Sequence, residues 1–290
     1  MRTLKQVSVV GLGLLGSSVS LSVLRAMPSV KVVGYSHRDS TRQKARQQGI
    51  ASRIEETLAT ATENADLVIL ATPISTFEDY FRQLSPYLKS GAIVTDVGST
   101  KAKVHRWAAR LLPKGVYFVG SHPIAGSEKQ GLDYGRDDLL IGAQCVLTQT
   151  KGTNLQALAA VRAFWEKLGC TVDLMAPAAH DRILGMVSHL PHIAAASLVN
   201  ANRLADMRSA GKGFMDTSRV ASGPANIWVD ILLTNPAACV HGIDKLIEQL
   251  ELFKAAIRAG DKETLEKLLD QARQKRDRLI AYKLEQKELF

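Results

Sequence analysis

The sequence has few cysteines and no long hydrophobic run. Its three cysteines, Cys145, Cys170 and Cys239, are widely spaced and odd in number, which argues against a disulfide scaffold, and no cysteine or histidine spacing typical of a metal site occurs. The apolar runs are far shorter than the ~18 residues of a membrane span, and the N-terminal segment predicts a strand instead of a signal peptide. We therefore expect a cytoplasmic protein that binds no metal and no membrane.

The sequence is also relatively poor in acidic residues. The chain has 37 Lys and Arg residues against 28 Asp and Glu residues, a net charge of +9. The basic residues are scattered, and their densest stretch, 273–278, lies in a predicted terminal helix with acidic neighbours, which is typical of a solvated helix face. We therefore expect no nucleic-acid partner, and we expect the positive charge to attract small anionic ligands.

Short apolar runs alternate with helical stretches through residues 1–175. The runs are continuously apolar, as strands buried on both faces are, and alternation of strands with helices is typical of a parallel sheet covered by helices. The runs predicted as strands are 7–10, 30–35, 67–71, 92–96, 117–120, 145–147 and 171–175. We predict an α/β protein in which residues 1–175 form a Rossmann-type, doubly wound dinucleotide-binding domain.

The rest of the chain, residues 176–290, has the composition of helices. An apolar, Ala-rich stretch at 178–206 contains Pro191, which predicts a kink, and the segment 211–223 predicts a loop. Gly260 and Asp261 predict the end of one helix and the N-cap of the last one. We predict that an all-helical domain follows the dinucleotide-binding domain.

A glycine motif follows the first predicted strand and begins a helix. Gly11 permits a tight turn, Gly13 lets the backbone approach a diphosphate, and Gly16 allows the helix to pack closely on the strand. The N–H groups and the positive dipole end of the helix then face the diphosphate. The residues predicted to bind the cofactor here are Gly11, Leu12, Gly13, Leu14, Leu15 and Gly16.

The end of the second predicted strand bears on the choice of cofactor. NAD sites usually carry an acidic residue there, which binds the ribose 2′-hydroxyl. This chain has Ser36, His37 and Arg38 instead, and a guanidinium suits a 2′-phosphate. The pattern favours NADP, whereas Asp39 would permit NAD if the strand ran further.

Candidate site residues follow three more of the predicted strands. Thr72 and Pro73, then Ser99, then His122 each come after a strand, and ligands of such sheets bind at the carboxyl ends of the strands. We expect these residues around the nicotinamide, with His122 placed to accept a proton while a hydride leaves the substrate.

Together these motifs resemble the prephenate/arogenate dehydrogenase family of tyrosine biosynthesis, and the resemblance covers nearly the whole chain. It rests on the glycine motif and on four others in the same order, which are Asp96-Val-Gly-Ser99-Thr-Lys101, Gly120-Ser-His122-Pro-Ile-Ala-Gly126, Ser188-His189-Leu-Pro191-His192 and Gly213-Phe-Met-Asp216-Thr-Ser-Arg219. Many relatives have a lysine where this chain has Met215. If that lysine contacts the substrate, recognition of the substrate side chain differs here.

The resemblance implies roles for six residues. His122 would be the catalytic histidine that accepts the hydrogen bond of the substrate's ring hydroxyl, Ser99 would lie beside it, and Arg219 would bind the ring carboxylate. The other residues implied to contact or line the pocket are His189, Trp228 and Glu128. The implied reaction is NAD(P)-dependent oxidative decarboxylation of prephenate or arogenate, which yields 4-hydroxyphenylpyruvate or tyrosine.

The resemblance also implies a homodimer formed through the helical domain, for which the Ala-rich helix at 193–198 is a candidate interface. Two other functions stay open. A β-hydroxyacid dehydrogenase of similar architecture would carry its catalytic lysine on the first long helix of the second domain, where this chain offers three histidines. A dinucleotide-sensing protein without turnover would have no need of His122, Ser99 and Arg219 at one site.

Overall fold

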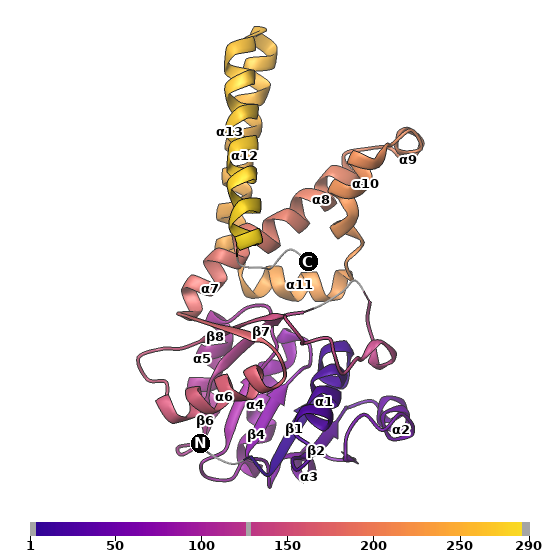
Figure 1. Cartoon of the computed structure of the whole chain (residues 1–290), viewed down its shortest axis with the longest axis vertical. Helices are drawn as coiled ribbons and strands as arrows, with labels where there is room; N and C mark the ends of the chain where they lie inside the picture. The colour runs from indigo at the N-terminus through magenta and orange to yellow at the C-terminus, as the bar shows by residue number, and fades with distance from the viewer. Residues whose placement is uncertain (1–3, 126–128, 286–290) are drawn as a thin grey trace. The chain divides into compact units, whose positions relative to one another are not determined.

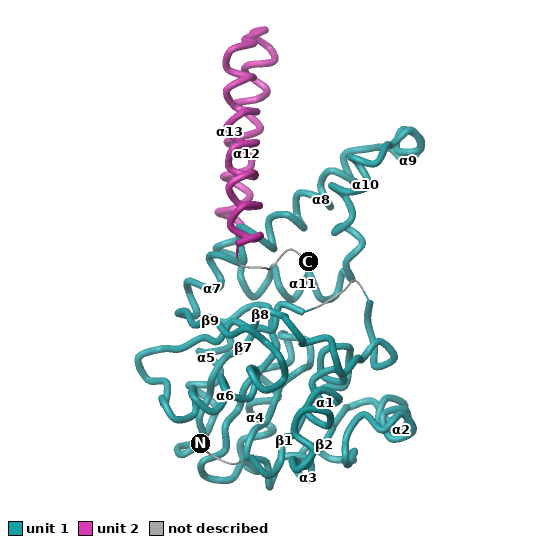
Figure 2. The backbone as a smooth tube through the Cα atoms, in the orientation of Figure 1, with its two compact units in different colours: residues 1–239 teal, residues 240–290 magenta. Residues whose placement is uncertain are grey.

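The computed structural model describes residues 4–125 and 129–285 (Figure 1). The chain forms two compact units, of which unit 1 comprises residues 1–239 and unit 2 comprises residues 240–290 (Figure 2). A parallel sheet with covering helices is followed by a helical C-terminal region, so the predicted fold class is confirmed.

Unit 1 is built on a six-stranded parallel sheet with the strand order β3-β2-β1-β4-β5-β6. The strands are β1 (Gln6–Val10), β2 (Lys31–Tyr35), β3 (Arg53–Glu55), β4 (Leu67–Leu70), β5 (Ile93–Asp96) and β6 (Tyr117–Phe118). Every residue of β1, β4 and β5 is buried, as their continuous apolar runs predict. The sequence does not predict β3, because only Ile54 of its three residues is buried and no apolar run marks it.

Helices cover both faces of this sheet (Figure 1). Val7 and Val9 enter a core with side chains of α1 and α6, whereas Val10 enters a second core with side chains of α4 and α5. Successive residues of a strand point to opposite faces, which is why β1 supplies both cores. The helices of these layers are α1 (Leu14–Ala26), α2 (Asp39–Gln47), α3 (Leu58–Thr62), α4 (Phe77–Leu84), α5 (Ala102–Leu111) and α6 (Leu155–Lys167).

A second sheet of three strands adjoins the first. Its strands, in the order β7-β8-β9, are β7 (Gly120–Ile124), β8 (Gln144–Thr148) and β9 (Thr171–Met175). β7 is antiparallel to β8, and β8 is parallel to β9. The prediction of one strand over 117–120 is wrong, because side chains of β5 hold the chain beyond β6: Thr95 donates to the backbone oxygen of Val119 at 2.7 Å, and Asp96 accepts the N–H of Ser121 at 3.1 Å. His122 therefore lies within a strand.

Unit 1 continues with helices, which are α7 (Pro177–Leu184), α8 (Leu190–Asn200), α9 (Leu204–Met207), α10 (Lys212–Ser218) and α11 (Ala225–Thr234). A π-helical turn, η4 (Gly185–His189), separates α7 from α8. The predicted irregularity thus falls in the turn before Pro191, because proline has no N–H and its ring crowds the carbonyl four residues earlier. The prediction of a loop at 211–223 is wrong, since α10 and the 3₁₀ turn η5 (Arg219–Ser222) occupy it.

One helical stretch, Pro177–Asn200, is long and apolar enough to cross a membrane by length and composition, with a mean hydropathy of 1.3. It nevertheless carries four buried polar residues, which are His180, Asp181, His189 and His192. Buried polar groups need hydrogen-bond partners, and His180 and Asp181 have theirs at His122 and at the N–H groups of residues 101 and 102, in the rest of unit 1. The stretch therefore fits a helix of the folded unit.

Unit 2 contains most of α12 (Pro236–Ala259) and all of α13 (Lys262–Glu285). Gly260 has a φ of +64°, and the N–H of Asp261 returns to the carbonyl of Ala256 at 2.9 Å. The carboxylate of Asp261 then accepts the N–H of Thr264 at 3.0 Å and caps α13. The predicted helix end and N-cap are confirmed.

Candidate active site

The turn after β1 has the form that a bound diphosphate requires. Gly11 has a φ of +100°, and a Cβ there would lie 2.6 Å from the backbone oxygen of Ala71. A Cβ on Gly16 would lie 1.9 Å from the backbone oxygen of Gly11, whereas one on Gly13 would meet no atom within 4 Å. Gly13 is the N-cap of α1 and makes no side-chain capping bond, and the first N–H groups of a helix have no acceptor within the helix, so they can bind an anion. The turn fits a dinucleotide.

The segment after β2 carries a serine where NAD sites usually carry a carboxylate. β2 ends at Tyr35, and the next residue, Ser36, is buried, whereas residues 37 and 38 are exposed. Asp39 lies in the first turn of α2, where its carboxylate accepts a hydrogen bond from Arg42 at 3.1 Å. The strand does not extend to Asp39, so this residue is not the strand-end carboxylate of an NAD site.

The register of the parallel strands places three strand ends in one row. Val10 of β1 pairs with Leu70 of β4, and Leu70 pairs with Asp96 of β5. Because adjacent strands lie ~4.8 Å apart, the first and third of these residues are about 10 Å apart. Thr72 and Ser99, both half-buried, follow the second and third strand. The predicted cofactor turn and the loop that carries Ser99 thus share the carboxyl edge of the sheet.

A buried ion pair fixes the backbone next to His122. Asp96 and Lys101 are completely buried, and Lys101 Nζ donates both to the Asp96 carboxylate and to the backbone oxygen of Ser121, the latter at 2.7 Å. The carboxylate also accepts the N–H of Gly98 at 2.9 Å. Burial raises the pKa of Asp96, and the neighbouring ammonium opposes this rise. The pair holds the start of β7, and with it His122, against the end of β5.

His122 is hydrogen-bonded to a histidine that contacts an aspartate on the same helix, α7. Its Nδ1 lies 2.9 Å from Nε2 of His180, and Nδ1 of His180 lies 2.8 Å from Oδ1 of Asp181. Asp181 also accepts the backbone N–H groups of Lys101 and Ala102 at 2.7 and 2.8 Å. Burial lowers the pKa of His122 well below its ordinary value, and the neighbouring His180 and Lys101 lower it further.

Helix α11 lies over the carboxyl edge of the sheet (Figure 1). Ser75, which follows β4, donates to Asp230 at 2.7 Å, and Thr100, which follows β5, donates to Thr234 at 2.9 Å. These two bonds fix the orientation of α11. They position Trp228, which packs against the core formed by α4 and α5.

Two buried histidines lie beside Trp228. The ring of His192 stacks on the indole with centroids 3.5 Å apart and 9° between the planes, and His189 meets it edge-on at 6.4 Å. Among the described residues, Nε2 of His189 and Nδ1 of His192 have no hydrogen-bond partner although both atoms are buried. Such atoms need a ligand or a water molecule. Both histidines, and not only the predicted His189, are therefore candidates to contact a substrate.

The remaining predicted site residues are exposed or lie outside the described residues. Pro73 is exposed, and so is Arg219 at the start of η5. Glu128 lies outside the described residues, although Gln130 donates to Asn226 of α11 at 3.3 Å. The roles of Arg219 and Glu128 stay predictions.

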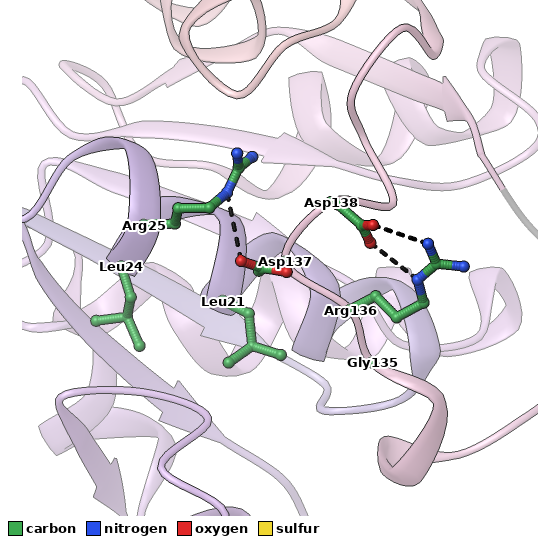
Figure 3. Close-up of a pocket in the computed structure, with 7 residues that line it drawn as sticks. All are labelled: Leu21, Leu24, Arg25, Gly135, Arg136, Asp137 and Asp138. Atoms are coloured by element: carbon green, nitrogen blue, oxygen red, sulfur yellow. Dashed lines mark hydrogen bonds and ion pairs between the residues drawn. The ribbon is translucent and has the colours of Figure 1, made fainter.

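A pocket at the other end of α1 lies apart from these residues (Figure 3). Its lining consists of Leu21, Leu24, Arg25, Gly135, Arg136, Asp137 and Asp138. Arg25 pairs with Asp137 at 3.5 Å, and Arg136 pairs with Asp138 at 2.8 Å. Since these charged side chains neutralise one another, we assign no ligand to this pocket.

The buried imidazoles predict a loss of stability in acid. Burial lowers the pKa of His189 and that of His105 to about 4, below the ~6.5 of an unfolded histidine. Between these values the unfolded chain binds more protons than the folded chain, so the free energy of unfolding falls as the pH falls. From about pH 7.5 to about pH 5, each group should cost about 2 kcal/mol, measured by urea unfolding at the two pH values.

Two variants locate the source of this loss. His189→Gln should reduce the difference in unfolding free energy between the two pH values by about 2 kcal/mol. His241→Gln, at an exposed position of α12, should retain the full wild-type difference. Equal unfolding free energies of the wild type at both pH values would contradict the prediction.

Comparison with known proteins matches two family models to consecutive parts of the chain. The model described as prephenate dehydrogenase, nucleotide-binding domain, matches residues 19–174, and the model described as prephenate dehydrogenase, dimerization domain, matches residues 176–271. A curated relative, the cyclohexadienyl dehydrogenase of Zymomonas mobilis, is 32% identical over 268 residues, which are 90% of this chain and 91% of the relative.

Solved structures of similar proteins share the fold of this chain. The prephenate dehydrogenase of Aquifex aeolicus, solved with hydroxyphenyl propionate and NAD+, is 34% identical with a TM-score of 0.87, and the match covers 96% of this chain and 99% of that one. The arogenate dehydrogenase of Synechocystis is 31% identical with a TM-score of 0.82, and the match covers 94% of this chain and 99% of that one.

Proposed function

The chain belongs to the prephenate dehydrogenase family, and we propose that it catalyses the oxidative decarboxylation of prephenate or arogenate to 4-hydroxyphenylpyruvate or tyrosine. It is an NAD(P)-dependent dehydrogenase. The position of His122 carries the finer proposal. The residue before it, Ser121, donates its N–H to Asp96 and accepts a hydrogen bond from Lys101. Asp96 lies in the row of strand ends that begins at the glycine turn.

The chemistry of such a substrate explains the residue types at this edge. Prephenate and arogenate are cyclohexadienols with a carboxylate para to the hydroxyl, and bound NAD(P) supplies the hydride acceptor. His122 takes the hydroxyl proton as carbonyl character develops at that carbon. Its lowered pKa keeps the imidazole neutral, and thus able to accept, near pH 7. Carbon dioxide then leaves the vinylogous β-keto acid, and the ring becomes aromatic.

The substrate is proposed to contact residues from several helices. The stacked rings of His192 and Trp228 offer a flat apolar surface beside the unpartnered nitrogens described above, which suits a planar ring. Arg219 would bind the ring carboxylate through two parallel hydrogen bonds, and His189 and Glu128 would line the pocket. Both prephenate and arogenate stay within the proposal, since they differ only in a ketone or an amine on the side chain.

We propose NADP as the preferred cofactor, with residues 36–38 at its 2′-phosphate. Arg38→Leu is expected to raise the KM for NADP by roughly 10–100-fold, the loss of one charge-assisted bond, and to change the KM for NAD by less than about threefold. Lys31→Leu removes the same charge from the opposite end of β2 and should leave both values unchanged. A wild-type KM that is lower for NAD than for NADP would contradict the preference.

We also propose a homodimer formed through residues 176–290 and a cytoplasmic location, with residues 1–175 as the dinucleotide-binding domain. Unit 2 exposes apolar side chains on both of its helices. They include Val240, Ile247, Leu250, Ile257, Leu269 and Leu279. Exposed apolar side chains that gather on one surface are typical of a protein interface, and these side chains support the proposed dimer.

An assay of reduced nicotinamide and aromatic product tests the function. The protein is supplied with prephenate or arogenate, each with NAD or NADP, and we expect turnover with at least one combination. Small β-hydroxyacids are tested beside them. Turnover with a β-hydroxyacid and with neither cyclohexadienol would identify the alternative enzyme, and cofactor binding without any turnover would identify a dinucleotide sensor.

A further inference from the structure

The hydrogen bonds around His122 form a buried chain that ends on a carboxylate. His122, His180 and Asp181 are exposed by only 9%, 0% and 5%, and the two bonds that join them are 2.9 and 2.8 Å long. Asp181 is itself fixed by the N–H groups of residues 101 and 102, where α5 begins. Asp181, at one end of this hydrogen-bonded series, is therefore held rigidly, and His122, at the other end, is the proposed base.

The donors and acceptors of this chain determine which nitrogen of each imidazole carries a hydrogen. Burial disfavours the charge of Asp181, but hydrogen bonds from His180 and from the backbone of α5 hold its pKa below the ordinary value. An ionised carboxylate only accepts, so Nδ1 of His180 carries the hydrogen and its Nε2 carries a lone pair. Nδ1 of His122 must then donate to that lone pair. Nε2 of neutral His122 is left with a lone pair of its own.

We propose that His180 and Asp181 are positioning residues that hold His122 in the tautomer whose Nε2 accepts the substrate's hydroxyl proton. The inference rests on the proposed function. The opposite tautomer would present an N–H to the hydroxyl and would be unable to remove its proton. In the reaction the proton would pass from the substrate oxygen to Nε2, the carbon–oxygen bond would become a double bond, and the hydrogen of that carbon would leave with its electron pair as a hydride, for which bound NAD(P) supplies the acceptor. The bond from Nδ1 to His180 stays as it is, so these residues need no rearrangement.

Other titratable groups surround this chain of hydrogen bonds from each neighbouring element. They are Asp96 and Lys101 at the end of β5 and the start of α5, His105 on α5, Cys145 on β8 and His189 on η4. The Lys101 ammonium disfavours a second positive charge on His122, and Asp96 lies on the far side of that ammonium, hydrogen-bonded to it. Asp181 is the carboxylate that is linked to His122 by hydrogen bonds through the imidazole of His180. It therefore also compensates the charge that His122 gains.

Two substitutions of His180 separate hydrogen bonding from packing. His180→Phe fills a similar volume but offers no acceptor to the Nδ1–H of His122, whereas His180→Gln offers an amide oxygen near the position of Nε2. We expect His180→Phe to lower kcat by roughly 10²-fold with the KM within about threefold, as for loss of a partner that orients a histidine. His180→Gln should stay within about fivefold of the wild type. Two folded variants with equally low kcat would overturn the proposal.

Nitrogen-15 NMR of the histidine side chains observes the tautomer without turnover. In the wild-type protein we expect His122 to carry hydrogen on Nδ1 and none on Nε2, with its signals assigned by their loss in His122→Asn. A hydrogen on Nε2 of His122 would overturn the proposal. Because this measurement uses the wild-type protein, it holds even if the His180→Phe variant does not fold. The expected tautomer in a protein that turns over neither substrate would contradict the proposed function alone. Turnover together with the opposite tautomer would contradict the positioning role alone.

Discussion

His122→Asn is expected to lower kcat by roughly 10²–10⁴-fold with little change in KM, the usual effect of losing a general base. The amide of asparagine lies near the position of Nδ1 and keeps a donor for His180, but it leaves nothing at the position of Nε2. The substitution therefore removes the proton acceptor and preserves most of the packing. Steady-state kinetics with the substrate found by the assay measure the effect, and urea unfolding checks the fold.

The control for this variant is the same substitution at a histidine outside the proposed site. His241→Asn, at an exposed position of α12, should leave kcat and KM unchanged. An unaltered kcat in His122→Asn would exclude His122 as the base. A raised KM with an unaltered kcat would make His122 a residue that binds the substrate and takes no proton from it.

The parallel sheet was predictable because its strands carry a local signal. β1, β4 and β5 are buried on both faces, and an uninterrupted run of apolar residues records that burial in the sequence. β7 carries no such signal, since its residues are Gly120–Ile124 and it is held by side chains of β5. A strand that depends on partners distant in the sequence is not visible in its own composition.

The candidate site was predictable where its residues adjoin strand ends. Gly11 and Ser99 each follow a strand of the parallel sheet closely, and the rule that ligands bind at the carboxyl ends of strands assigns them together. The same rule selected His122, although this residue lies within β7. Asp181 escaped the prediction because it is 59 positions beyond His122 and follows His180 on a helix without a motif. Its role depends on two bonds to the first turn of α5, which only the folded chain brings near.

The same geometry bears on the hydroxyacid alternative. That alternative places a catalytic lysine on the first long helix of the second domain, whereas this helix, α7, carries His180, and its imidazole is bonded to His122. Lys101, which is buried beside the site, donates to Asp96 and to a backbone oxygen. The ammonium of Lys101 thus holds the backbone of β7 in place. Removing it should therefore change the stability of the fold.

Lys101→Met is expected to lower the free energy of unfolding by about 3–5 kcal/mol, the usual cost of breaking a buried ion pair from one side. The side chains of Lys101 and Asp96 are both 0% exposed. Methionine fills most of the volume but leaves the carboxylate without its ammonium and the oxygen of Ser121 without that donor. Urea unfolding of the variant and the wild type at the same pH measures the difference.

A double variant distinguishes lost charge compensation from lost packing. Lys101→Met with Asp96→Asn carries no uncompensated charge, so it should be more stable than Lys101→Met alone, and equal stability would attribute the loss to packing. Lys245→Met breaks an exposed pair of 2.8 Å with Glu248 and should cost less than about 0.5 kcal/mol. The double variant should not recover kcat, because the backbone oxygen of Ser121 still lacks the ammonium that holds it, and His122 is the next residue.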